Sequence, residues 1–277
     1  MAAPICENCT KGTKLPGKPT GNMVNIGGID TYVAPPPRPL APGNEHKAVV
    51  IFTDALGLPL GNSQIIADGF AKELNLPVYV PDMFNGSPPI SPEAMSSVDH
   101  FEVGKPRPFW NKLRFYGLLL TILPNIILYN APGKVAARMQ GWCDALRKEK
   151  GVERLGAVGH CYGGMVIVKL AALRSGILQA AVVAHPGSIK QEEIDKVDFP
   201  CAWATCQEDQ SFPQPFAKQV EKSFQARDDK TKVPYEFVYY PGTMHGFAAR
   251  PALHVPEIRE AFEKVTEQSW KWLQKYL

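Results

Sequence analysis

Residues 154–164 read RLGAVGHCYGG, and the order of features in this run indicates how the whole chain folds. The run at 154–158 predicts a strand, the sequence GHCYG at 159–163 predicts a sharp turn, and a helical pattern follows at once. A strand that enters a helix through G-x-C-x-G has the pattern of a nucleophile elbow, with cysteine in place of serine. The sequence therefore predicts an α/β fold that presents Cys161 at the carboxyl end of a strand.

The elbow also has a chemical rationale. Glycines at 159 and 163 let neighbouring backbone pass where a Cβ atom would clash. The first N–H groups of the following helix, with the positive end of its dipole, face the central side chain and stabilise a thiolate. Because G-x-C-x-G also occurs by chance, the alternative interpretation is a buried structural cysteine in a glycine-rich turn.

Strand and helix patterns alternate on both sides of this motif. Apolar runs predict strands at 48–53, 77–80, 180–184, 200–205 and 235–240, and helical spacing predicts helices at 62–74, 132–149, 163–174, 214–225 and 257–275. Such alternation is typical of βαβ units. We therefore expect a single domain over residues 1–277, with a mostly parallel central sheet flanked by helices.

Two segments depart from this alternation. Residues 1–45 form an irregular N-terminal extension that contains one short hairpin around Gly27 and Gly28. Residues 82–133 are too long for a strand-to-helix connection, and we expect an insertion that forms a lid over the site.

The second half of the insertion contains the apolar run FYGLLLTILPNIILY at 115–129. This run is shorter than the roughly 20 apolar residues that a membrane-spanning helix needs. It predicts a buried helix or an apolar lid, and no transmembrane segment.

An elbow in this kind of sheet requires an acid and then a histidine farther along the chain. Asp209 follows the strand predicted at 200–205, and His245 follows the strand predicted at 235–240. Because active sites of open α/β sheets lie at the carboxyl ends of strands, we expect both side chains to meet Cys161. His245 would act as the general base, and Asp209 would fix its tautomer. Glu208 is the alternative acid.

The oxyanion of an acyl-transfer reaction needs two backbone donors. The N–H groups of Tyr162, at the head of the helix, and of Ala55, after the strand at 48–53, are the candidates. The other histidines have weaker claims: His160 can simply pack inside the elbow, His185 can line the pocket, and surface positions are expected for His46, His100 and His254.

Composition excludes some function classes. The net charge is +3, basic and acidic residues are interspersed, and no Lys/Arg run reaches five, so neither a nucleic-acid nor an anionic-membrane partner is supported. The N-terminus has no apolar signal core, which favours a cytoplasmic protein with reduced thiols. Cys6-x-x-Cys9 could be half of a zinc site, but no second pair follows, so we expect no metal and a mobile tail there.

Several of these stretches resemble the dienelactone hydrolase family, from about Met23 onward. They are DALG at 54–57, PDMFNG at 81–86, GHCYGG at 159–164, ATCQEDQSFP at 204–213 and GTMHGFAAR at 242–250. The sequence looks most similar to the eukaryotic, largely fungal branch. The resemblance implies an α/β-hydrolase fold, a Cys–Asp–His triad, and hydrolysis of enol-type lactones or related esters without a cofactor.

The resemblance assigns further roles. Bacterial members carry a glutamate just after the early strand that holds or releases the thiol proton, and Asp54 occupies the matching position. Arg250 matches one of two arginines that bind the substrate carboxylate, with Phe247 beside it as a further substrate-binding residue. Residues 85–86 (NG) supply no arginine for the other. Together with the apolar insertion, this favours a larger and more apolar substrate.

The sequence therefore predicts a cysteine-dependent hydrolase of a small-molecule ester or lactone, acting as a monomer or homodimer. A thiol nucleophile favours activated carbonyls such as enol lactones. Two alternatives come from other classes of protein: a ligand-binding module with this fold but no useful turnover, and a redox-sensing thiol protein.

Overall fold

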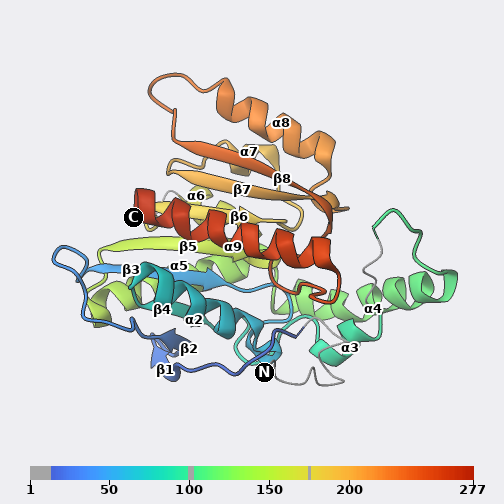
Figure 1. The fold of residues 1–277 in the computed structure, drawn as a ribbon, viewed down its shortest axis with the longest axis horizontal. Helices are drawn as coiled ribbons and strands as arrows, with labels where there is room; N and C mark the ends of the chain where they lie inside the picture. Colours follow the sequence, from blue (N-terminus) through green and yellow to red (C-terminus); the bar gives the residue numbers. More distant parts are fainter. Residues whose placement is uncertain (1–13, 99–102, 174–175) are drawn as a thin grey trace.

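The computed structural model describes residues 14–98, 103–173 and 176–277, and these form one eight-stranded sheet between two layers of helices (Figure 1). Across the sheet the strands follow the order β1-β2-β4-β3-β5-β6-β7-β8. Their bounds are β1 (Asn22–Ile26), β2 (Ile29–Ala34), β3 (Lys47–Phe52), β4 (Val78–Pro81), β5 (Arg154–His160), β6 (Ala180–Ala184), β7 (Cys201–Glu208) and β8 (Tyr235–Met244).

Strand direction follows from the connections. β1 and β2 form a hairpin in which Ile26 pairs with Ile29. Gly27 and Gly28 between them have φ of 57° and 82°, the positive values that a two-residue hairpin turn needs. β2 pairs antiparallel with β4, whereas the remaining strands are parallel because helices carry the chain back between them.

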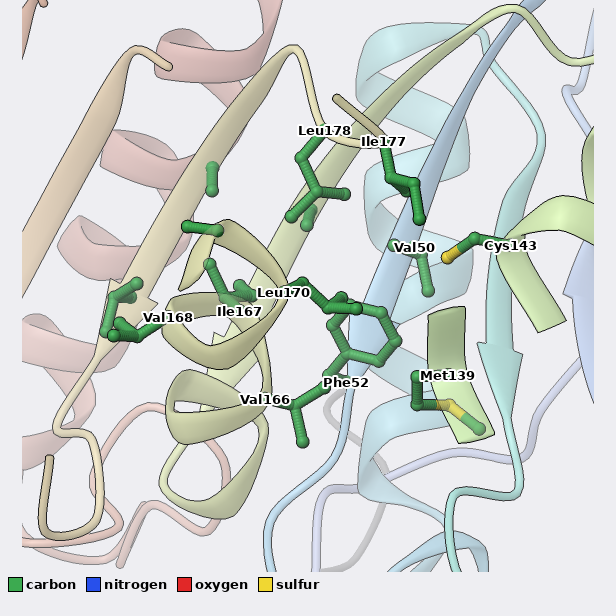
Figure 2. Packing of buried hydrophobic residues seen from close by; sticks show 14 of the residues in the cluster. Val50, Phe52, Met139, Cys143, Val166, Ile167, Val168, Leu170, Ile177 and Leu178 are labelled. Atoms are coloured by element: carbon green, nitrogen blue, oxygen red, sulfur yellow. The ribbon is translucent and has the colours of Figure 1, made fainter. Parts of the chain in front are cut away.

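Helices cover both faces of the sheet. α2 and α9 pack on one face, and α5, α6 and α8 pack on the other. Figure 2 shows Val50 and Phe52 of β3 together with Met139 of α5 and Val166 of α6 in the second of these cores. The helices are η1 (Leu58–Leu60), α2 (Asn62–Leu74), α3 (Pro92–Ser96), α4 (Phe109–Leu128), α5 (Pro132–Lys150), α6 (Tyr162–Ala172), α7 (Gln191–Ile194), α8 (Gln214–Gln225) and α9 (Pro256–Tyr276).

β5 lies in the middle of the sheet and leads to the elbow. Six of its seven residues are buried, because helices cover it on both sides. A Cβ atom at Gly156 would lie 2.9 Å from Leu273 of α9, so a residue without a side chain is needed for this helix to pack closely. This packing holds the strand, and the turn after it, in a fixed position.

The predicted α/β-hydrolase architecture is confirmed, and the boundaries of α2, α8 and β6 match the sequence prediction. The hairpin predicted around Gly27 and Gly28 is present as β1 and β2. It is not part of a separate extension, however, because β2 hydrogen-bonds to β4 as part of the central sheet. The reason is that the exposed edge of β4 accepts an antiparallel partner without any crossover helix.

The insertion contains α3 and α4, and α4 lies beyond the carboxyl ends of the strands (Figure 1). α4 begins at Phe109 and continues through Pro124, and only Ile122 among its residues is buried. The expectation of a buried helix is therefore wrong, and the role of a lid stays a prediction. Within the described residues no single helix is long and apolar enough to cross a membrane, although α4 and α5, bent by 52°, pass that test as a pair by length and composition.

Candidate active site

Cys161 stands between β5 and α6 in a conformation that side chains rarely adopt. Its φ is 51° and its ψ is −106°, and its N–H donates to the carbonyl of Ala184 at 3.1 Å. Backbone strain of this kind persists only where the surroundings hold it, and it concentrates at functional sites. The side chain is thereby raised from the sheet at the head of α6.

The two glycines of the motif are needed because the backbone passes so close. A Cβ atom at Gly159 would lie 2.5 Å from the carbonyl oxygen of Gly163. A Cβ atom at Gly163 would lie 2.0 Å from the carbonyl oxygen of Phe52, at the end of β3. Both positions of G-x-C-x-G must therefore be glycine, so that the turn can pack against its own helix and against the neighbouring strand.

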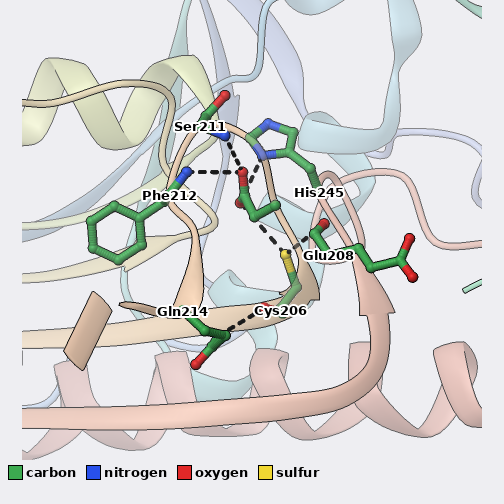
Figure 3. Close-up of polar contacts among 7 residues, drawn as sticks. Cys206, Glu208, Ser211, Phe212, Gln214 and His245 are labelled. Carbon is green, nitrogen blue, oxygen red and sulfur yellow. Dashed lines mark hydrogen bonds and ion pairs between the residues drawn. The ribbon is translucent and has the colours of Figure 1, made fainter. Parts of the chain in front are cut away.

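Asp209 follows β7 and is held by a set of donors (Figure 3). Its Oδ1 accepts from the backbone N–H groups of Ser211 and Phe212 at 2.8 and 3.0 Å. Its Oδ2 accepts from the thiol of Cys206 at 3.5 Å and contacts Nδ1 of His245 at 2.9 Å. Its side chain is 1% exposed, and burial alone would raise the pKa of Asp209, but the bonds from His245 and the backbone hold it below its ordinary value.

His245 connects the acid to the nucleophile. It lies directly after β8, and its N–H donates to the carbonyl of Glu208 at 2.9 Å. Its side chain hydrogen-bonds to Cys161 as well as to Asp209. Burial would lower the pKa of His245, but Cys161 and Asp209 outweigh it and raise this pKa well above its ordinary value. The three predicted triad residues therefore lie in one hydrogen-bonded chain.

Glu208, the alternative acid, does not contact the imidazole. Its side chain is exposed and points away from His245 (Figure 3). Its Oε1 accepts from the N–H of Gly104 at 2.6 Å and so ties the insertion to the end of β7. The geometry therefore favours Asp209 as the acid that pairs with His245, whereas the side chain of Glu208 bonds to the insertion.

The two candidate oxyanion donors come from the start of α6 and from the loop after β3. Tyr162 is the first residue of α6, so its N–H has no acceptor within the helix. Ala55 follows β3, where the carboxylate of Asp54 already takes the N–H of Leu56 at 3.0 Å. The N–H groups of Ala55 and Tyr162 stay predictions as the oxyanion hole.

Asp54 and Arg250 form an ion pair beside the triad. Nε of Arg250 lies 3.1 Å from Oδ2 of Asp54, and the two side chains are 10% and 4% exposed. Burial raises the pKa of Asp54, and the charge of Arg250 opposes that rise. A Cβ atom at Gly246 would lie 2.9 Å from the guanidinium, so Arg250 packs closely over the residue after His245.

Three residues predicted near the site form the packing behind His245. His185 is fully buried and lies between His160 and His245: it stacks on the ring of His160 at 6.1 Å between centroids, and it meets the ring of His245 edge-on at 5.1 Å. Burial lowers the pKa of both His160 and His185, so both imidazoles are neutral near pH 7. Phe247 is 3% exposed and packs against His185 and Tyr240. Its substrate-binding role stays a prediction; through His185 it forms part of the packing behind His245.

Sequence reasoning missed Cys206 as a partner of Asp209. Burial and the neighbouring carboxylate raise the pKa of Cys206, so it remains a thiol that can donate. The only sequence signal was its place three residues before the acid on the same strand end. Cys143 and Cys201 are also buried and reduced, in the core.

Some predictions concern residues outside the described ranges, namely Cys6, Cys9 and His100. Among the residues that are described, no group of three His, Cys, Asp or Glu side chains could hold a metal ion. His46 and His254 lie at the surface, as expected. Two surface hollows, one beside Asp68 and one beside Gln214, have none of the three triad residues in their linings.

Comparison with known proteins defines the family. The model of the dienelactone hydrolase family matches residues 122–277, more than half of the chain. The chain belongs to the dienelactone hydrolase family. The family identifies it as a hydrolase of lactones or esters, in agreement with the prediction from sequence.

Curated relatives of this dienelactone hydrolase family member match along nearly the whole chain. Hydrolase pyvD of Aspergillus violaceofuscus is 29% identical over 99% of this chain and 98% of its own length. The carboxymethylenebutenolidase homolog of Homo sapiens is 26% identical over 97% of this chain and 96% of its own. A putative dienelactone hydrolase from Klebsiella pneumoniae has the same fold, with a TM-score of 0.66 at 17% identity over 93% of this chain and 99% of that one.

Proposed function

We propose that Cys161, Asp209 and His245 hydrolyse an activated ester or lactone through an acyl-thiol intermediate. The observation that carries this proposal is the hydrogen-bonded chain from the strained Cys161 through His245 to Asp209, whose last link measures 2.9 Å. A nucleophile, a base and an orienting acid in this arrangement are the requirement for covalent acyl transfer.

The chemistry follows from the donors and acceptors. With Nδ1–H donating to Asp209, Nε2 of His245 takes the proton of the Cys161 thiol, and the thiolate attacks the carbonyl carbon. The N–H groups of Ala55 and Tyr162 stabilise the oxyanion. As the tetrahedral intermediate collapses, the C–O bond breaks and the leaving oxygen takes the proton from His245. Water, deprotonated by His245, then attacks the thioester and restores the thiol.

The substrate is an activated carbonyl compound, because a thiolate is a far better leaving group than an ordinary alkoxide. Enol lactones and enol or aryl esters release a stabilised oxygen anion, so collapse of the intermediate proceeds forward. The names of two relatives, carboxymethylenebutenolidase homolog and Dienlactone hydrolase 1, point to the same class. Arg250 is the candidate to orient an anionic group of the substrate, and Asp54, its partner, the candidate to modulate the thiol.

A substrate panel tests this proposal. Rates for an enol lactone, an aryl ester, an alkyl ester and the matching amide are measured with the wild type and Cys161→Ala. We expect turnover that depends on Cys161 and falls in that order, with the amide inert. Equal rates for the amide and the lactone, or turnover by Cys161→Ala, would refute the thiol mechanism.

A further inference from the structure

α4 exposes an unusual amount of apolar surface. Of the thirteen large hydrophobic side chains that are exposed in the described chain, ten lie within residues 109–129. They are Phe109, Trp110, Leu113, Tyr116, Leu119, Leu120, Leu123, Ile127, Leu128 and Tyr129. A contiguous apolar surface of this kind marks an interaction site.

The arrangement on the helix is the reverse of that on an ordinary surface helix. The side facing the body carries the less exposed positions, among them Asn111, Phe115 and Ile122. At 100° per residue, the opposite side presents a row that we call the outer stripe: Phe109, Leu113, Tyr116, Leu120, Leu123 and Ile127. The side turned to solvent is therefore apolar along the whole helix.

The charged residues in the stretch of chain that carries the outer stripe have one sign. Between residues 103 and 143 the chain has no Asp or Glu, and it has six basic residues. They are Lys105, Arg107, Lys112, Arg114, Lys134 and Arg138. Lys112 and Arg114 are both exposed. At 100° per residue, Lys112 borders the outer stripe, whereas Arg114 lies farther round the helix, toward the body. Trp110 and Tyr129, with an apolar ring and a polar group, lie near its two ends, as aromatic residues do at a membrane interface.

We propose that the outer stripe docks on an anionic membrane surface, with α4 lying in the plane of the lipid interface. An apolar face flanked by Lys and Arg is the composition of interfacial helices, which bury the apolar face and attract anionic headgroups. A second copy of this chain fits less well, because residues 103–143 of that copy contain no Asp or Glu to pair with Lys112 and Arg114. The net charge of +3 gave no hint of this surface, because the positive charge is concentrated in one segment.

Docking would place the candidate active site at the lipid surface. Before α4, the N–H of Gly104 donates to Glu208, which precedes Asp209. After α4, the carbonyl of Asn130 accepts from the hydroxyl of Tyr162, the residue next to Cys161. Apolar esters dissolved in a membrane would then reach the triad directly; this consequence rests on the proposed function, whereas the docking itself does not.

Vesicle flotation tests the docking without any need for turnover. The wild-type protein is mixed with vesicles of phosphatidylcholine alone or with added phosphatidylserine, and the bound fraction is measured. Leu120→Glu places a charge in the centre of the outer stripe, at a side chain that is 71% exposed, so we expect the fold to be retained. Met23→Glu, at an exposed apolar residue of β1, is the matched control. Thermal midpoints of both variants check the fold.

We expect binding to the phosphatidylserine vesicles, a loss of about tenfold or more in partitioning for Leu120→Glu, and no loss for Met23→Glu. Lys112→Gln with Arg114→Gln should weaken binding to the anionic vesicles only. Failure of the wild type to float, equal binding to both compositions, or undiminished binding of Leu120→Glu would overturn the proposal. A wild-type dimer that Leu120→Glu dissociates, without flotation, would assign the stripe to self-association and overturn it too.

Discussion

At Cys161 the backbone adopts a φ of 51°, and hydrogen bonds to other backbone groups hold it there. Its carbonyl accepts from Gly164 and Gly187, and its N–H donates to Ala184. These bonds place the thiol at the head of α6 without engaging the side chain. The sulfur is therefore available for His245 and for a substrate.

Substitutions at two adjacent residues, Asp209 and Glu208, test which of them is the acid of the triad. Asp209→Asn removes the charge that fixes the tautomer of His245, and we expect the turnover rate to fall by about a hundredfold or more. Glu208→Gln changes a side chain that hydrogen-bonds to Gly104 of the insertion, and its rate should stay within about twofold of the wild type. Steady-state kinetics with an aryl ester measure both, and a larger loss in Glu208→Gln would reverse the assignment.

The ion pair of Asp54 and Arg250 makes a prediction about stability. Arg250→Met leaves the buried Asp54 carboxylate without its cation, so the free energy of unfolding should fall by about 3 kcal/mol. Adding Asp54→Asn removes the unpaired charge and should recover most of the loss. Denaturant unfolding measures all three chains; losses that simply add would show that the two side chains do not interact.

At the scale of elements, the spacing of apolar residues and the positions of glycines that end helices made most of the sheet predictable. Apolar runs located β3 and β6, and Gly151, with a φ of 67°, ends α5 where the pattern stops. The insertion was less predictable, because the water-facing side of α4 is apolar and its pattern resembles that of a buried helix. Pairing of β2 with β4 could not be predicted either, since strand order depends on contacts far apart in sequence.

The elbow itself can be tested by glycine substitution. Gly163→Ala would place a Cβ atom 2.0 Å from the carbonyl oxygen of Phe52, so the free energy of unfolding should fall by about 3 kcal/mol. Gly141→Ala, in the middle of α5 with open space around it, should instead raise this free energy by about 0.5 kcal/mol. Denaturant unfolding measures the free energy of both variants. Equal changes in Gly163→Ala and Gly141→Ala would contradict the close packing at Gly163.

At the scale of the whole molecule, the sheet collects residues that are far apart in sequence. Order along the chain and the position of each residue after a strand were enough to predict Cys161, Asp209 and His245. They could not predict what surrounds them: the Asp54–Arg250 pair or the edge contact of His185 behind His245. Such contacts depend on loop conformation, which carries no periodic signal.

The triad also links stability to pH. The pKa of His245 is raised to about 10 in the folded chain, against about 6.5 unfolded, so its stabilising contribution is complete below about pH 6.5 and is lost as the pH rises through the folded value. The free energy of unfolding of the wild type, relative to His245→Asn, should therefore decrease between neutral and alkaline pH. Denaturant unfolding across that range measures this difference in free energy. A difference that grows with pH would contradict a stabilising charge on His245 beside Asp209 and Cys161.

Whether Cys161 carries the acyl group is decided by rapid-quench mass spectrometry with p-nitrophenyl acetate. In the wild type we expect acetyl on the peptide containing Cys161 during the burst, and longer persistence of this adduct in His245→Asn, because deacylation needs the base. Cys143→Ala, which removes a buried thiol of the core, should be acetylated at Cys161 like the wild type. Turnover with no acetyl at Cys161, or turnover retained by Cys161→Ala, would contradict the mechanism.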